Sequence, residues 1–213
     1  MKRASFALVL LAACGDDGMA TVDAPPDPCM PDMQFTGEFI DWDSTESAFK
    51  GVFGAKFTLQ ADAAKMTMTA PNGRWILCAP AADGLATVDT ASTSGYVGGT
   101  VKIDKTVIQS GSQLSYRSFT ATRAADFGFD ATKAHVFVHV DNGARTVTTS
   151  DAPAVKKHFD GSAWVDGNTG TDIYLGNISG TTTSVQVSGG GATGASSIPL
   201  EAGKITYLTI VAK

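Results

Sequence analysis

The chain has 213 residues, enough for one large or two small domains, since a domain usually takes about 100 to 200 residues. Its 16 Lys and Arg against 21 Asp and Glu give a formal net charge of −5. A chain with a net negative charge has no overall positive field to attract a phosphate backbone, which argues against nucleic-acid binding. Charged residues are only 17% of the chain and glycine is frequent, with 23 residues, a composition typical of strands joined by turns.

Residues 1–13 have the composition of a signal peptide. Residues 1–3 are cationic, and residues 4–13 form an apolar run that is too short to cross roughly 30 Å of hydrocarbon as a mature helix. The Leu-Ala-Ala-Cys at residues 11–14 resembles the lipobox of bacterial lipoproteins, in which the cysteine becomes the lipidated N-terminus. We therefore expect acyl chains on Cys14 to anchor the protein in a membrane of the bacterial cell envelope, inner or outer. An ordinary secretory signal followed by an incidental cysteine is the alternative.

Residues 14–33 are expected to form an extended, acidic tether. They contain four prolines and five aspartates and almost no side chains that could form a core. The folded part of the chain can therefore stand off the membrane to which Cys14 is attached.

Two further cysteines are expected to pair. With Cys14 lipidated, Cys29 and Cys78 remain in a chain that is exported to an oxidising compartment, which predicts a disulfide between them. The bond would close a loop of about 50 residues and stabilise the fold by about 4 kcal/mol in the chain-entropy model. Two free thiols are the alternative.

Short strands are predicted along the first half of the chain. Ala55, Phe57 and Leu59 alternate with polar residues, as expected for a strand with one buried face. The alanine-rich stretch 121–134, which Gly128 interrupts, is expected to connect two domains. The close spacing of the strands favours a β-sandwich or barrel. Further strands are predicted at residues 66–69, 74–79, 85–90, 100–108 and 114–122.

The second half is also predicted to consist of strands. Residues 134–140 and 145–150 flank Asp-Asn-Gly-Ala at residues 141–144, which predicts a hairpin. The final apolar segment, residues 204–212, is apolar on both faces, so we expect it in the middle of its sheet rather than at an edge. Further strands are predicted at residues 171–175 and 182–188.

A turn with a distinctive sequence joins two strands of the first half. Residues 69–77 read Thr-Ala-Pro-Asn-Gly-Arg-Trp-Ile-Leu, preceded by Gly-Val at residues 51–52 and followed by Pro80 and by Gly-Tyr at residues 95–96. This pattern of about 50 residues resembles the carboxypeptidase regulatory-like, transthyretin-like β-sandwich domains. Residues 81–84 depart from it, because the family usually has glycine directly after the proline. The whole chain resembles bacterial lipoproteins that have no established activity.

The resemblance implies an all-β fold. Residues 172–180 and 184–187 are similar, more faintly, to the closing strands of the same modules. We therefore expect two tandem Ig-like or transthyretin-like β-sandwich domains after the signal peptide and tether. The first, carboxypeptidase regulatory-like domain is placed at residues 34–125 and the second at residues 126–213. A single larger β domain is the alternative architecture.

The sequence predicts no enzyme. It contains no G-x-S-x-G motif of the kind that positions a serine nucleophile. Gly189, Gly191 and Gly194 have the G-x-G-x-x-G spacing of dinucleotide-binding loops, but Pro199 stands where the phosphate-binding helix would run. A hairpin loop is the better interpretation, and neither a catalytic residue nor a cofactor is expected.

The three histidines do not predict a metal site. His135 and His139 have the spacing of a chelating pair on a helix, but the Val-Phe-Val between them indicates a strand. On a strand the two side chains would share one face at a distance of about 13 Å. With His158 as the only other histidine, we expect no zinc or iron site and solvent-facing side chains.

Two further groups of residues have a possible binding role. Asp41, Asp43 and Glu46 could offer oxygens to calcium, but their spacing matches no ligand loop, and a solvated strand end is the better interpretation. The three tryptophans could form a sugar-binding platform, although packing in the core is the better interpretation for a sandwich. They are Trp42, Trp75 and Trp164.

The sequence therefore predicts a non-catalytic lipoprotein that acts as a binding or structural module for an unidentified ligand. Its expected partners are the membrane, through the acyl chains on Cys14, and an envelope protein or polysaccharide. A carbohydrate-binding or enzyme-accessory lipoprotein is the alternative. An exposed row of aromatic side chains on one sheet would favour sugar binding.

Overall fold

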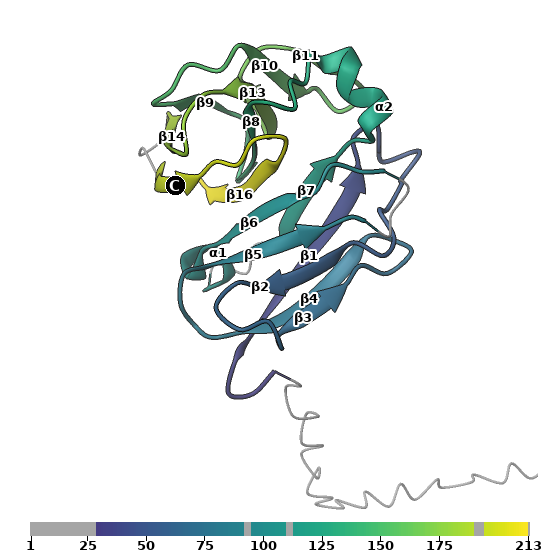
Figure 1. Ribbon diagram of the computed structural model, residues 1–213, viewed down its shortest axis with the longest axis vertical. Coiled ribbons are helices and arrows are strands. Elements are labelled where there is room, and N and C mark those ends of the chain that lie inside the picture. The colour runs from purple at the N-terminus through teal and green to yellow at the C-terminus, as the bar shows by residue number, and fades with distance from the viewer. Residues whose placement is uncertain (1–28, 92–94, 110–112, 190–193, 213) are drawn as a thin grey trace, which may run out of the picture.

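The chain is all-β. The computed structural model describes residues 29–91, 95–109, 113–189 and 194–212, and Figure 1 shows the first half below the second. The strands of the first half are β1 (Met33–Asp41), β2 (Lys56–Leu59), β3 (Met66–Met68), β4 (Arg74–Ala79), β5 (Gly84–Asp89), β6 (Gly99–Ile103) and β7 (Leu114–Ser118). Those of the second half are β8 (Ala134–Asp141), β9 (Arg145–Thr149), β10 (Val155–Phe159), β11 (Trp164–Asp166), β12 (Thr169–Gly170), β13 (Asp172–Ile178), β14 (Thr182–Ser188), β15 (Gly194–Pro199) and β16 (Ile205–Val211). The helices are α1 (Lys105–Gln109), α2 (Ala121–Ala124) and the 3₁₀ turn η1 (Ala125–Phe127).

One sheet of nine strands runs through both halves. Its order is β11-β10-β13-β8-β16-β6-β5-β2-β3, and the halves are joined where β16 pairs in parallel with β6 on one side and β8 on the other. A sheet of three strands, β4-β1-β7, and a sheet of four strands, β12-β9-β14-β15, complete the fold. The division into domains at residues 125 and 126 stays a prediction, and hydrogen bonds of the large sheet cross it.

A glycine allows the two halves to approach at this junction. An ideal Cβ on Gly99 would lie 1.8 Å from the backbone oxygen of Ile205, far inside any allowed contact. Glycine at this position of β6 therefore lets β16 lie against it, which continues the sheet from the second half into the first.

The nine-stranded sheet separates two hydrophobic cores. On β8, Phe137 faces the core that the three-stranded sheet closes, and Val136 faces the core that the four-stranded sheet closes. Tyr207 and Leu208 of β16 divide in the same way. Because β16 is buried on both faces and paired along both edges, the prediction that residues 204–212 form a central strand is confirmed.

The hairpin predicted around residues 141–144 is wrong. Both edges of β8 are already occupied, by β13 and by β16, so β9 has no free edge to pair with. The chain instead turns at Asn142 and Gly143, whose φ angles are 67° and 106°, and β9 enters the four-stranded sheet. The chain turns where the sequence predicts, but the strand that follows the turn belongs to another layer.

Other predicted elements differ mainly at their ends. Residues 74–79 and 182–188 are strands with the predicted bounds. The strand predicted at residues 100–108 ends at Ile103, and helix α1 follows it. Strands β14 and β15 pair in antiparallel fashion, which confirms that the glycine-rich segment joins a hairpin, although residues 190–193 lie outside the described residues.

The disulfide predicted between Cys29 and Cys78 is present. It attaches the start of the described chain to β4 across a sequence separation of 49 residues. Cys14 and most of the predicted tether lie outside the described residues. No helix of the described part of the chain is long and apolar enough to cross a membrane.

Candidate functional site

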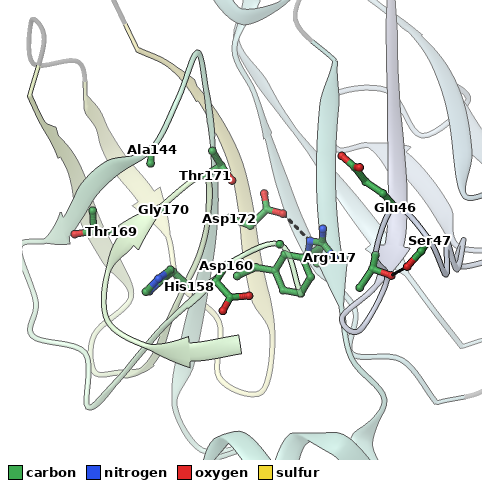
Figure 2. A pocket seen from close by; sticks show the side chains of 13 residues that line it. Glu46, Ser47, Arg117, Ala144, His158, Asp160, Thr169, Gly170, Thr171 and Asp172 are labelled. Carbon is green, nitrogen blue, oxygen red and sulfur yellow. Dashed lines mark hydrogen bonds and ion pairs between the residues drawn. The ribbon is translucent and has the colours of Figure 1, made fainter. Parts of the chain in front are cut away.

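A polar cleft of about 810 Å³ lies between the two halves (Figure 2). One wall is the segment 45–47, which follows β1, and the other is formed by residues 158–161 and 169–172 together with Ala144. Arg117 of β7 also lines it. Nine of the thirteen lining residues have polar side chains, and the volume falls within the roughly 300 to 1,000 Å³ of small-ligand sites.

A buried ion pair between Arg117 and Asp172 lies in this cleft. Nε of Arg117 donates to Oδ2 of Asp172 at 2.6 Å, and Nη1 donates to the backbone oxygen of Ser44 at 2.7 Å. The guanidinium lies 4.1 Å above the ring of Phe159. Only 9% of Arg117 and 6% of Asp172 is exposed. Nη2 has no hydrogen-bond partner among the described residues, so its N–H groups are available to a ligand.

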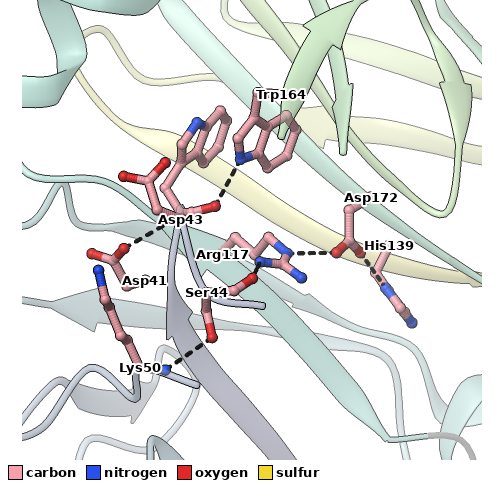
Figure 3. A network of polar contacts seen from close by, with 9 residues as sticks. Asp41, Asp43, Ser44, Lys50, Arg117, His139, Trp164 and Asp172 are labelled. Atoms are coloured by element: carbon pink, nitrogen blue, oxygen red, sulfur yellow. Dashed lines mark hydrogen bonds and ion pairs between the residues drawn. The ribbon is translucent and has the colours of Figure 1, made fainter. Parts of the chain in front are cut away.

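Asp172 also forms a hydrogen bond with His139. Its Oδ1 accepts a hydrogen bond from Nδ1 of His139 at 2.6 Å, so the carboxylate lies between His139 and Arg117 (Figure 3). Burial alone would raise the pKa of Asp172, but the hydrogen bonds and charges of His139 and Arg117 outweigh it and lower the pKa below its usual value. Asp172 is therefore held as a carboxylate and does not supply a proton.

Strand register brings this cluster together. Asp172 is the first residue of β13 and lies opposite His139 of β8 on one side and Phe159 of β10 on the other. Arg117 comes from β7, which pairs in parallel with β1 in the smaller sheet. The pair Arg117 and Asp172 is 55 residues apart in sequence, and neither residue belongs to a motif. The single signal in the sequence is an aspartate at the start of an otherwise apolar strand.

Aromatic stacking ties the two halves together beside the cleft. Trp164 lies parallel to Trp42 with ring centroids 3.7 Å apart, and its Nε1 donates to the backbone oxygen of Trp42 at 2.7 Å. Trp42 and Trp75 are buried, and Trp164 is half-buried. The three tryptophans thus pack in or against the core, and they do not form the exposed row that a sugar platform would need.

The expectation that the histidines face solvent is wrong for His135. Its ring is fully buried, stacks on Phe129 at 4.0 Å, and accepts at Nδ1 a hydrogen bond of 2.8 Å from the hydroxyl of Tyr174. Nε2 lies 3.1 Å from the backbone oxygen of Asp130, which assigns the proton to Nε2. Burial lowers the pKa of His135 to about 4, so the ring is neutral at physiological pH.

The other two histidines are half-buried. His139 is bonded to Asp172, and His158 lines the cleft. His135 and His139 share one face of β8, as predicted from the period of a strand. Within the described residues no group of three or more His, Cys, Asp or Glu side chains is placed to hold a metal ion.

The acidic residues at the end of β1 do not converge. Asp41 accepts a hydrogen bond from the hydroxyl of Tyr96, and Asp43 forms an ion pair with Arg123 at 3.0 Å. Glu46 lies on the wall of the cleft. This arrangement is that of a strand end whose carboxylates have separate partners, and it is not a calcium loop.

Comparisons with protein-family models, with curated proteins and with solved structures found no match for this chain. The resemblance to bacterial lipoproteins and to transthyretin-like domains therefore stays a prediction.

Proposed function

We propose that the protein is a non-catalytic binding module of the bacterial cell envelope, held to a membrane through acyl chains on Cys14, with the polar cleft as its ligand site. The observation that carries the proposal is Arg117. A guanidinium that is nine-tenths buried yet keeps Nη2 without a protein partner is positioned to recognise a ligand in the cleft.

The surroundings of the cleft support binding rather than catalysis. Asp172 is paired on both oxygens, and the charges beside it favour its ionised form. The histidine partners are a carboxylate, a tyrosine and backbone groups, and no serine or threonine of the described chain is hydrogen-bonded to a histidine. A nucleophile activated by a base, the usual arrangement for covalent catalysis, is thus not assembled in the described residues.

Blocking the cleft tests its role. Ala144 is exposed on the cleft wall, so Ala144→Trp should fill part of the space without disturbing the core. We expect amide NMR signals of residues 45–47 and 169–172 to shift when the detergent-solubilised full chain is titrated with envelope material separated into glycan, peptide and lipid fractions. At least one fraction should shift them in the wild type and not in Ala144→Trp. Ala82→Trp, at an exposed alanine of another turn, is the control.

Two results would contradict this role of the cleft. One is that no fraction shifts these signals. The other is that the shifts persist unchanged in Ala144→Trp.

Anchoring is tested separately at Cys14. We expect the wild type to incorporate a fatty-acid analogue and to partition into detergent, because the lipobox-like sequence directs acylation to Cys14. Cys14→Ser should do neither, whereas the double variant Cys29→Ser, Cys78→Ser should still be labelled. Equal labelling of the wild type and Cys14→Ser would contradict the lipid anchor and leave the cleft proposal standing.

A further inference from the structure

The cleft is lined by both hydrogen-bond donors and hydrogen-bond acceptors. Nη2 of Arg117 supplies donors, and the carboxylate of Glu46 and Oδ2 of Asp160 supply acceptors, on either side of Arg117 in the view of Figure 2. Oδ1 of Asp160 already accepts hydrogen bonds from Ser162 and Ala163. Hydroxyl groups, which donate and accept, also line the cleft. They belong to Thr45, Ser47, Thr169 and Thr171.

The charges of the cleft select against ions. The positive charge of Arg117 is matched by Asp172. Of the two other carboxylates, Asp160 interacts with the ring of His158, and Glu46 has no such neighbour among the described residues. Glu46 has no hydrogen bond or ion pair with any described residue, and backbone N–H groups of Ala163 and Ser162 lower the pKa of Asp160. An anion would be repelled by these two carboxylates. A metal cation is not favoured either, since the described carboxylates and histidines do not converge into a site for one.

Few apolar side chains line the cleft. Among the described lining residues, Phe159 and Ala144 alone have an apolar side chain, and Phe159 is 8% exposed with Arg117 above its ring. Peptides are usually held by apolar pockets or by strand addition, and the cleft provides no apolar pocket of this kind. Its matched donors and acceptors instead fit a ligand that carries several neutral hydroxyl groups.

We propose that the cleft binds a neutral saccharide, an inference that rests on the proposed function of the cleft. Nη2 of Arg117 donates to a hydroxyl or ring oxygen of the sugar, while Glu46 and Asp160 accept from its hydroxyl groups. A hydroxyl can accept from the guanidinium and donate to a carboxylate at once, which is the pattern of groups that this cleft presents. Because none of the described lining residues opens an aromatic face into the cleft, binding depends on hydrogen bonds and is weak.

The test uses the detergent-solubilised full chain and defined probes. These are maltotriose, cellotriose and chitotriose as neutral saccharides, citrate as an anion, and trialanine as a peptide. Saturation-transfer NMR and titration of the amide signals report binding. We expect at least one trisaccharide to bind and to shift signals of residues 169–172, and we expect citrate and trialanine not to do so.

Matched variants connect the binding to the cleft. Glu46→Ala should weaken saccharide binding about tenfold, the loss expected for one hydrogen bond to a charged group. Glu201→Ala, at another exposed glutamate without a side-chain partner in the described structure, should bind as the wild type does. Thr171→Val should also weaken binding, and Thr182→Val, at an exposed threonine of β14, should not.

The outcomes separate the two proposals. If no trisaccharide binds, or if Glu46→Ala and Thr171→Val both bind as tightly as the wild type, the saccharide inference is overturned. If trialanine or a peptide fraction shifts the cleft signals and Ala144→Trp abolishes the effect, the cleft remains a ligand site and only the saccharide inference fails. If neither the trisaccharides nor any envelope fraction shifts these signals, both proposals fail.

Discussion

Replacing Asp172 by alanine should lower the free energy of unfolding by about 3 to 5 kcal/mol. The substitution leaves the guanidinium of Arg117, which is 9% exposed, without a carboxylate. It also removes the acceptor for Nδ1 of His139. A charge that stays buried without a counter-charge accounts for most of the cost. Urea unfolding at neutral pH, followed by tryptophan fluorescence, measures the difference.

Two further variants show whether burial of the ion pair causes the loss of stability in Asp172→Ala. Glu38→Ala removes the partner of Arg74, whose side chain is 68% exposed, and should cost less than about 1 kcal/mol. The double variant Arg117→Met, Asp172→Leu removes both buried charges and should recover most of the stability that Asp172→Ala loses. Equal losses for Asp172→Ala and Glu38→Ala would show that the buried pair contributes no more than a surface pair.

The ion pair links the site to the fold. Arg117 lies in the three-stranded sheet and Asp172 in the nine-stranded sheet, so the pair fastens the two layers where the cleft opens. The stacked Trp42 and Trp164 join the same two parts of the chain. Groups that line the cleft are thus held by contacts that also stabilise the fold, which favours a preformed site over one that closes around its ligand.

Local pattern was sufficient to predict several strands and their places. The alternation of Ala55, Phe57 and Leu59 predicted β2, and all three side chains are buried. The two apolar faces of residues 204–212 predict a central strand, and β16 contributes side chains to both cores. The spacing of apolar residues within a segment indicates whether one or both of its faces are buried. These features can therefore be predicted without knowing the rest of the chain.

Pairing between distant strands could not be predicted in this way. The sequence Asp-Asn-Gly-Ala at residues 141–144 has the turn chemistry of a hairpin, but the edges of β8 are taken by β13 and β16, which follow much later in the chain. The orientation of Met66 and Met68, which are 56% and 57% exposed, also depends on strand pairing. Thr67 lies opposite the buried Phe57, so the register turns the two methionines outward.

The candidate site was not predictable for the same reason. Arg117, His139 and Asp172 are isolated polar residues in three strands. Arg117 lies 55 residues before Asp172 in the sequence, and His139 lies 33 residues before it. No motif joins them, and only the register of β7, β8 and β13 brings them together. The prediction that His135 faces solvent was wrong. The alternation of a strand shows which face of the sheet a residue lies on, but it does not show that Phe129 covers this face.

Acidification from pH 8 to pH 5 should cost the wild type about 2 kcal/mol of stability through His135. Burial lowers the pKa of His135 to about 4 in the native state, whereas in the unfolded chain it is near 6.5. Below pH 6.5 the unfolded chain therefore binds a proton that the native ring does not, so the free energy of unfolding falls as the pH drops toward 4. Above pH 6.5 this contribution to stability is fully present.

His135→Gln isolates this effect. The variant should be less stable than the wild type at pH 8, because Gln cannot reproduce the stacking on Phe129, and the difference between the two proteins should shrink by about 2 kcal/mol at pH 5. Urea unfolding at the two pH values measures both proteins. A difference between wild type and His135→Gln that stays constant from pH 8 to pH 5 would mean that His135 is protonated as readily in the native core as in the unfolded chain.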